Sequence, residues 1–162
     1  MSKRLFLLIL ALVSTAALLP ACGSGNTAEK PSGKYEILRK TTLGNAWQMY
    51  QFRLDIESGG EFDIDLLDLG EGDRVDGYFY PEKGSGAALQ IRAGNTPIYQ
   101  SNPAGGVVGG AVSDRFSFTA TQPRGNAYVL LFSNAGTEKT ISVFVEIIYP
   151  STASIRGPLD AK

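Results

Sequence analysis

Residues 50–56, YQFRLDI, decide the fold class, because every second side chain in this stretch is apolar. The apolar positions are Tyr50, Phe52, Leu54 and Ile56, and the polar positions between them are Gln51, Arg53 and Asp55. Successive side chains of an extended strand point to opposite faces, so one face of this segment can be buried while the other meets solvent. The pattern therefore predicts a half-buried β-strand.

The same period of two recurs along most of the chain. It is clear in residues 62–66, 116–120, 128–133 and 141–148, and weaker in residues 35–42, 74–80, 87–92 and 97–100. No stretch has a sustained helical period, and 19 Gly and 8 Pro separate the segments. We expect an all-β chain: a two-sheet antiparallel β-sandwich, jelly-roll-like, of about eight strands, with one core in residues 35–150.

Composition excludes several kinds of chemistry. The chain of 162 residues has 15 Lys+Arg against 16 Asp+Glu, one Cys and no His. A net charge of −1 argues against a nucleic-acid partner, which requires a basic surplus to neutralise phosphates. The lack of His excludes Ser-His-Asp and Cys-His nucleophile systems and His-ligated metals. We therefore expect a protein that is not an enzyme.

The N-terminal segment has the features of a targeting signal. Lys3 and Arg4 precede an apolar run from Leu5 to Leu19. A helix of that length would rise about 22 Å, which is less than the roughly 30 Å hydrocarbon core of a bilayer. The segment is therefore predicted to be a signal peptide rather than a membrane-spanning helix.

The end of this segment, Leu19-Pro20-Ala21-Cys22, resembles the lipobox of bacterial lipoproteins. The resemblance implies cleavage before Cys22 and attachment of acyl chains such as palmitate to its thiol, which would form a stable membrane anchor. The implied organisation is a signal peptide at 1–21, a lipidated N-terminus and flexible linker at 22–34, the sandwich domain at 35–150 and a loose tail at 151–162. The alternative is an ordinary secretory signal cleaved near Ala21. The expected location is extracytoplasmic, at a bacterial membrane in the cell envelope.

A second resemblance rests on strand motifs in a fixed order. They are GEGDRVDGYF at 70–79, LQIRAGNTPIY at 89–99, RFSFTA at 115–120, GNAYVLLFSN at 125–134 and KTISV at 139–143. This succession, over about residues 46–149, is similar to the GOLD domain, a β-sandwich of small cargo receptors of the eukaryotic early secretory pathway and of some lipid-binding proteins. The resemblance implies an interaction module without catalytic residues, and only the generic role of binding protein or lipid carries over.

Residues 55–76 are strongly acidic and contain nine carboxylates. Calcium ions take six to eight oxygen ligands, so this stretch contains the candidate Ca²⁺ ligands. The candidates are Asp63, Asp65, Asp68, Glu71 and Asp73. The alternative is a solvated outer face whose like charges discourage pairing at a sheet edge. No other cofactor is expected.

Three aromatic residues are candidates for binding. Trp47 occupies the strand face opposite Tyr50, and Tyr78 and Tyr80 share the face opposite Phe79. Apolar side chains on both faces of a strand indicate either that a neighbouring loop or residues 35–42 cover the second face, or that this face is a protein-contact surface.

Taken together, the sequence predicts a membrane-anchored extracytoplasmic lipoprotein that acts as a non-catalytic protein-interaction module. Its expected partners are the membrane, through the lipid, and another extracytoplasmic protein. The alternative is a carbohydrate- or calcium-dependent ligand-binding β-sandwich.

Overall fold

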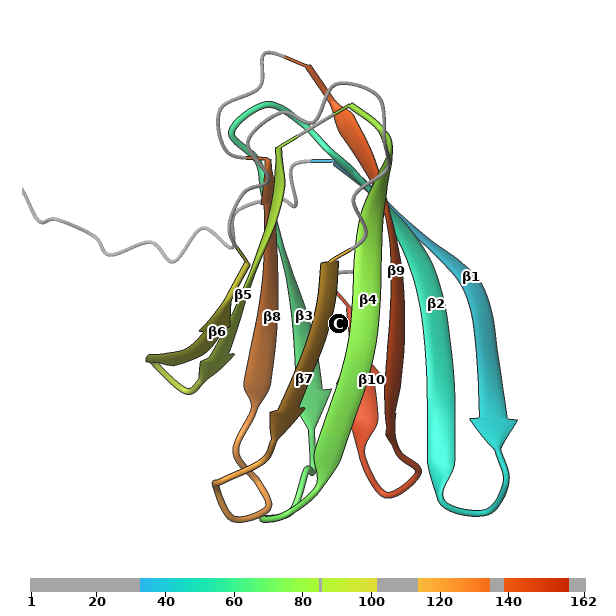
Figure 1. Ribbon diagram of the computed structural model, residues 1–162, viewed down its shortest axis with the longest axis vertical. Helices are drawn as coiled ribbons and strands as arrows, with labels where there is room; N and C mark the ends of the chain where they lie inside the picture. The colour runs from blue at the N-terminus through green and yellow to red at the C-terminus, as the bar shows by residue number, and fades with distance from the viewer. Residues whose placement is uncertain (1–32, 85, 102–113, 135–138, 158–162) are drawn as a thin grey trace, which may run out of the picture.

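The computed structural model describes residues 33–84, 86–101, 114–134 and 139–157. These residues form β-strands and no helix. The strands are β1 (Gly33–Leu43), β2 (Trp47–Ile56), β3 (Glu61–Leu67), β4 (Arg74–Lys83), β5 (Ala87–Ala93), β6 (Thr96–Gln100), β7 (Asp114–Thr119), β8 (Tyr128–Asn134), β9 (Ile141–Pro150) and β10 (Ser154–Arg156). They form two five-stranded sheets (Figure 1): sheet A, in the order β1-β2-β9-β4-β7, and sheet B, in the order β10-β3-β8-β5-β6.

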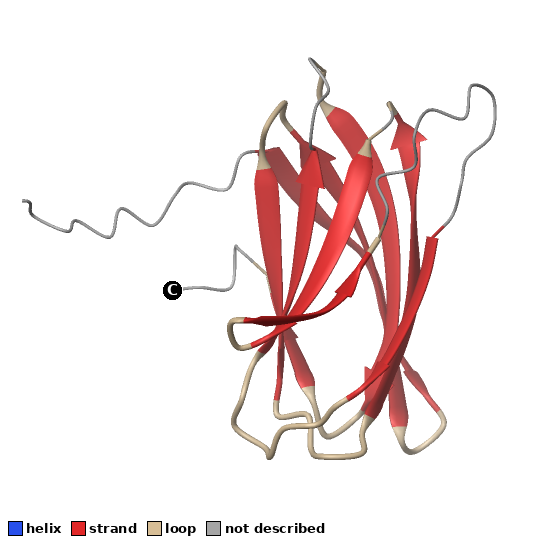
Figure 2. Ribbon diagram, turned by 60° about the vertical axis from the view of Figure 1, so that its left-hand side comes forward, coloured by secondary structure: helices blue, strands red, loops and turns tan. Residues whose placement is uncertain are grey.

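The strand order is that of a jelly roll. Strands β2 to β9 alone make two four-stranded sheets, β2-β9-β4-β7 and β3-β8-β5-β6, and all their pairings are antiparallel. Between β2 and β9, successive strands belong to opposite sheets except β5 and β6, which pair as a hairpin, as in double Greek-key sandwiches. Figure 2 shows the strands arranged in two layers. The predicted two-sheet antiparallel sandwich is therefore confirmed. The described residues form ten strands rather than about eight. Strand β1, predicted at residues 35–42, extends sheet A beside β2, and β10, which was not predicted, extends sheet B beside β3.

The predicted loose tail at 151–162 is wrong for residues 151–157. Strand β10 pairs with β3, where Ile155 lies opposite Leu66, and Arg156 forms an ion pair with Asp65. Ala153 is only 6% exposed. A strand of three residues is too short to show a period of two, so no alternating pattern predicts it. At the other end, β1 begins at Gly33, inside the predicted linker.

The core between the sheets is built around Phe132 of β8. Its ring meets Phe52 of β2 edge-on, with centroids 6.2 Å apart and planes at 86°, and it meets Phe79 of β4 at 5.8 Å and 82°. Edge-to-face pairs of this kind add to the stabilisation that comes from burying the rings. Because Phe52 and Phe79 belong to sheet A and Phe132 to sheet B, these contacts join the two layers.

Strand β4 has a glycine where the core requires it. A Cβ atom at Gly77 would lie 2.3 Å from Cζ of Phe116 and 2.6 Å from the carbonyl oxygen of Glu146. Both distances are far below van der Waals contact. Glycine at this position lets the ring of Phe116, from the neighbouring strand β7, pack directly over the backbone of β4.

The central position of Phe132 gives a first prediction. Phe132→Ala should lower the free energy of unfolding by about 3–5 kcal/mol, because it removes the ring shared by both sheets and leaves a cavity. Leu131→Ala is the matched control, since its side chain is half-buried on the outer side of the same strand and should cost about 1 kcal/mol. Urea denaturation measures both. Equal losses in the two variants would contradict this core arrangement.

A second prediction concerns Tyr149, whose side chain is fully buried and donates a hydrogen bond of 3.0 Å to Oε1 of Gln48. Burial, followed by the neighbouring Tyr50, raises the pKa of Tyr149 to about 12. In the unfolded chain the phenol loses its proton near pH 10, so between about pH 10 and 12 the folded state binds more protons than the unfolded state. The free energy of unfolding should therefore fall as the pH rises through this range. Denaturation curves should show a shallower fall for Tyr149→Phe, and an identical fall would contradict the assignment.

Candidate functional site

The outer face of sheet A, which points away from the core, brings together side chains from three adjacent strands. The cross-strand registers place them in two neighbouring rows: Gln51, Glu146 and Tyr78 in one, and Arg53, Phe144 and Tyr80 in the next, each row given in the order β2, β9, β4. These positions alternate with the buried residues of the same strands, so their side chains leave the sheet on the solvent side.

Tyr78, Tyr80 and Phe144 form an aromatic cluster on this face, and all three side chains are half-buried. The rings of Tyr80 and Phe144 stack with centroids 5.1 Å apart, and those of Tyr78 and Phe144 are 5.9 Å apart. The rings of Tyr78 and Tyr80 lie within 8° of parallel at 6.4 Å. At 5.1 Å, Tyr80 and Phe144 are too close to lie side by side in one plane, so each turns a ring face toward the other.

Glu146 lies beside the aromatic cluster and accepts two hydrogen bonds there. Its Oε2 atom accepts a hydrogen bond of 2.5 Å from Nε2 of Gln51 and one of 3.5 Å from the hydroxyl of Tyr78. Burial, followed by the charge of Glu146 and the proximity of Tyr80, raises the pKa of Tyr78. The phenol of Tyr78 therefore stays protonated at neutral pH and remains a donor to the carboxylate.

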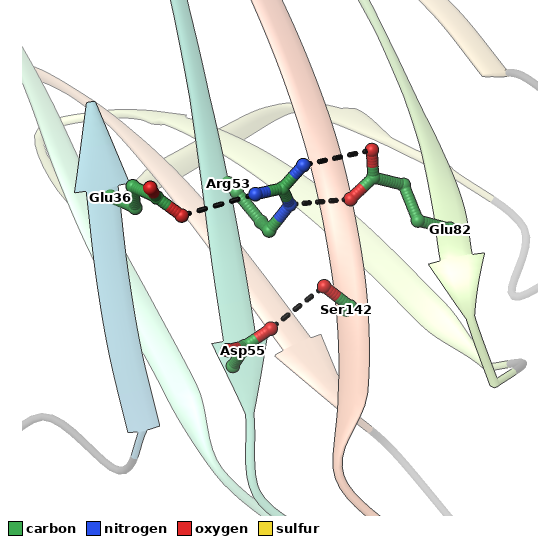
Figure 3. Close-up of polar contacts among 5 residues, drawn as sticks. All are labelled: Glu36, Arg53, Asp55, Glu82 and Ser142. Carbon is green, nitrogen blue, oxygen red and sulfur yellow. Dashed lines mark hydrogen bonds and ion pairs between the residues drawn. The ribbon is translucent and has the colours of Figure 1, made fainter. Parts of the chain in front are cut away.

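Arg53 lies on the other side of the aromatic cluster, opposite Phe144. Figure 3 shows its ion pairs. Its Nη1 atom lies 3.1 Å from Oε2 of Glu36 on β1, and its Nε atom lies 2.5 Å from Oε2 of Glu82 on β4, across β9. The hydrogen bond and charge of Glu82, followed by those of Glu36, raise the pKa of Arg53 above its ordinary value. Exposed ion pairs contribute little to stability, so their main effect here is to fix the positions of the side chains beside the aromatic rings.

The three predicted binding residues do not all lie together. Tyr78 and Tyr80 belong to the aromatic cluster, whereas Trp47 lies opposite Pro150, four residues along β9 from Glu146, or about 13 Å away. Residues 35–42 do not cover this face, because β1 pairs beside β2 and extends the same sheet. Phe144 was not predicted as a site residue. The one feature that could have indicated it is an apolar side chain at an outward position of its strand.

The acidic candidates do not converge on one point. Asp63 and Asp65 share the outer face of β3, as predicted, but Asp65 is paired with Arg156. Asp68, Glu71 and Asp73 follow in the β3–β4 connection, where Oδ2 of Asp73 accepts a hydrogen bond of 2.7 Å from the backbone of Gly70. Among the described residues, no three Asp, Glu, His or Cys side chains are placed to hold a metal ion together.

This arrangement gives a third prediction. Calcium chloride at millimolar concentration should raise the midpoint of thermal unfolding no more than magnesium chloride at equal ionic strength. The reason is that a ligand stabilises a protein only through a site that exists in the folded state. A rise of several degrees seen with Ca²⁺ alone would contradict it.

Cys22 lies outside the described residues. In the part of the chain that the structure describes, no helix is long and apolar enough to cross a membrane.

No family model matches the chain, and no curated protein is similar to it. Among solved structures, one described as "CBM4 structure and function" has 11% identity and a TM-score of 0.37, over 80% of this chain and 82% of that chain. Another is an uncharacterized conserved protein with a double-stranded β-helix domain from Klebsiella pneumoniae subsp. pneumoniae MGH 78578. It has 16% identity and a TM-score of 0.34, over 75% of this chain and 79% of that chain. The strand order and register of the two sheets by themselves identify the jelly-roll fold.

Proposed function

We propose that this protein is an extracytoplasmic lipoprotein, anchored through Cys22, whose β-sandwich is a non-catalytic binding module. In this proposal the outer face of sheet A binds another extracytoplasmic protein. The observation that carries it is the aromatic cluster of Tyr78, Tyr80 and Phe144, which is held half-exposed on an outward face by neighbouring side chains.

The composition of this face supports a protein partner. Aromatic side chains and arginine are enriched at such interfaces, and rings that already pack against one another lose little conformational freedom on binding. Glu146 and Arg53 supply polar groups at the border of the aromatic cluster, where a partner can form hydrogen bonds around an apolar centre. The arrangement supports an apolar contact with a polar rim.

The same ring geometry favours a protein over a sugar on this face. A flat sugar-binding platform requires ring faces open to solvent, whereas Tyr80 and Phe144 each turn one face toward the other ring. A protein side chain can pack against ring edges as well as faces. We therefore assign a protein partner to the outer face of sheet A.

The proposal also includes a relation to the GOLD domain. The motifs RFSFTA and GNAYVLLFSN lie on β7 and β8, and KTISV leads into β9, so the resemblance covers strands of both sheets. The role implied by the GOLD domain, binding without turnover, agrees with a chain that has no His. The proposed protein therefore combines a GOLD-like binding domain with a lipid anchor.

Site-specific crosslinking tests the binding face. A photoreactive phenylalanine analogue at Tyr80 should crosslink to one partner protein in cells, whereas the same analogue at Val129, on the outer face of sheet B, should not. In the purified complex, Tyr80→Ala with Phe144→Ala should weaken binding about 30-fold, or roughly 2 kcal/mol, as for the central residues of an interface. Unchanged affinity in a variant that remains folded would refute the assignment of this face.

Metabolic labelling tests the anchor separately. An alkynyl palmitate should label the wild-type protein and leave Cys22→Ala unlabelled, because the chain has no other thiol. The variant should also move from the detergent phase to the aqueous phase on phase partitioning, since the acyl chains supply the membrane affinity. Ser24→Ala serves as a processing control that keeps the thiol. Wild-type protein without label would overturn the anchoring proposal.

A further inference from the structure

A shallow hollow of about 210 Å³ lies on the outer face of sheet B. Its lining comes from four strands, β3, β5, β6 and β8, and includes Glu61, Gln90, Arg92, Gln100, Leu131 and Ser133. The aromatic cluster lies on the outer face of the other sheet, so the hollow is separate from the proposed protein-binding face.

Cross-strand pairing arranges the hollow as an aliphatic floor between polar walls. Leu131 of β8 lies opposite Gln90 of β5, and Gln90 lies opposite Gln100 of the edge strand β6. In the next row, Ser133 lies between Glu61 and Ala88. The side chains of Leu131 and Ala88 thus supply apolar surface, and two amides, a guanidinium and a hydroxyl surround it.

Several of these polar groups retain hydrogen-bonding capacity. Nε of Arg92 donates a hydrogen bond of 2.5 Å to Oε1 of Gln90, which fixes the guanidinium and leaves its two terminal nitrogens and the amide nitrogen of Gln90 available as donors. The side-chain amide of Gln100 and the hydroxyl of Ser133 also line the hollow. The hollow therefore offers donors and acceptors at several points around its floor.

The charges around the hollow select against ions. Among the described residues that line the hollow, Arg92 is the only cation, and Glu61 also belongs to the lining. Asp63 lies nearby, opposite Leu131. The carboxylate of Asp63 would repel an anion, and among the described residues no three His, Cys, Asp or Glu side chains are grouped to hold a metal cation. The volume is also smaller than the several hundred Å³ typical of sites for drug-sized ligands, so the ligand that fits is small, neutral and polar.

We propose that this hollow binds one ring of a neutral saccharide. Planar amide and guanidinium groups can pair with adjacent hydroxyls of a sugar, and the apolar C–H face of the ring would lie on Leu131 and Ala88. A site this open should bind weakly, with a dissociation constant of roughly 1 mM. Such a site would give the module a second ligand on the face opposite its protein partner.

Saturation-transfer NMR on the full chain in detergent micelles tests the proposal. The probes are the methyl glycosides of glucose, mannose and N-acetylglucosamine. At least one should receive saturation from the protein, most strongly at the ring protons that face Leu131. Gln100→Ala should weaken its binding about two- to tenfold, as expected for loss of a hydrogen bond between neutral groups. Gln100 is an exposed residue of an edge strand, so the variant should fold normally.

Gln51→Ala is the matched control, because it removes the same amide from the outer face of sheet A. It should leave sugar binding unchanged. Absence of saturation transfer to all three glycosides would overturn the proposal, and so would equal loss of binding in Gln51→Ala and Gln100→Ala. Neither result bears on the protein-binding face, whose crosslinking test is independent.

Discussion

The contacts of Phe132 with Phe52 and Phe79 are the interaction on which the rest of the molecule depends. They bind one sheet to the other at the centre of the sandwich and so fix which side of each strand is the inside. Because the period of a strand is two, fixing the inner side also fixes the outer side. Phe79 points into the core, and for that reason its neighbours Tyr78 and Tyr80 point to solvent beside Phe144.

Much of this could be predicted from the sequence because alternation is a local property. The series Tyr50, Phe52, Leu54 and Ile56 is buried as predicted, and the outward direction of Tyr78 and Tyr80 follows from the same rule. The neighbours of each strand could not be predicted, because β9 lies between β2 and β4 through contacts distant in sequence. The role of Phe144 depends on that placement, and Trp47 falls outside the aromatic cluster for the same reason.

The two outer faces differ in chemistry although one fold produces both. Sheet A presents stacked rings bordered by Glu146 and Arg53, whereas sheet B presents amides and a guanidinium around Leu131. Together with the proposed lipid anchor, the two proposed binding faces would let a single small domain join a protein to a glycan. The sandwich supplies the rigid support that both surfaces require, and neither role needs a catalytic group.

Nitration of tyrosine, mapped by mass spectrometry on the folded protein, tests most directly whether alternation fixes the inner and outer sides as described. Tyr78 and Tyr80 are half-exposed on the outer face, while Tyr128 and Tyr149 have no exposed surface. The account predicts modification of Tyr78 and Tyr80 before unfolding, and of Tyr128 and Tyr149 only after it. Early modification of Tyr128 or Tyr149, or full protection of both outer tyrosines in the isolated protein, would contradict it.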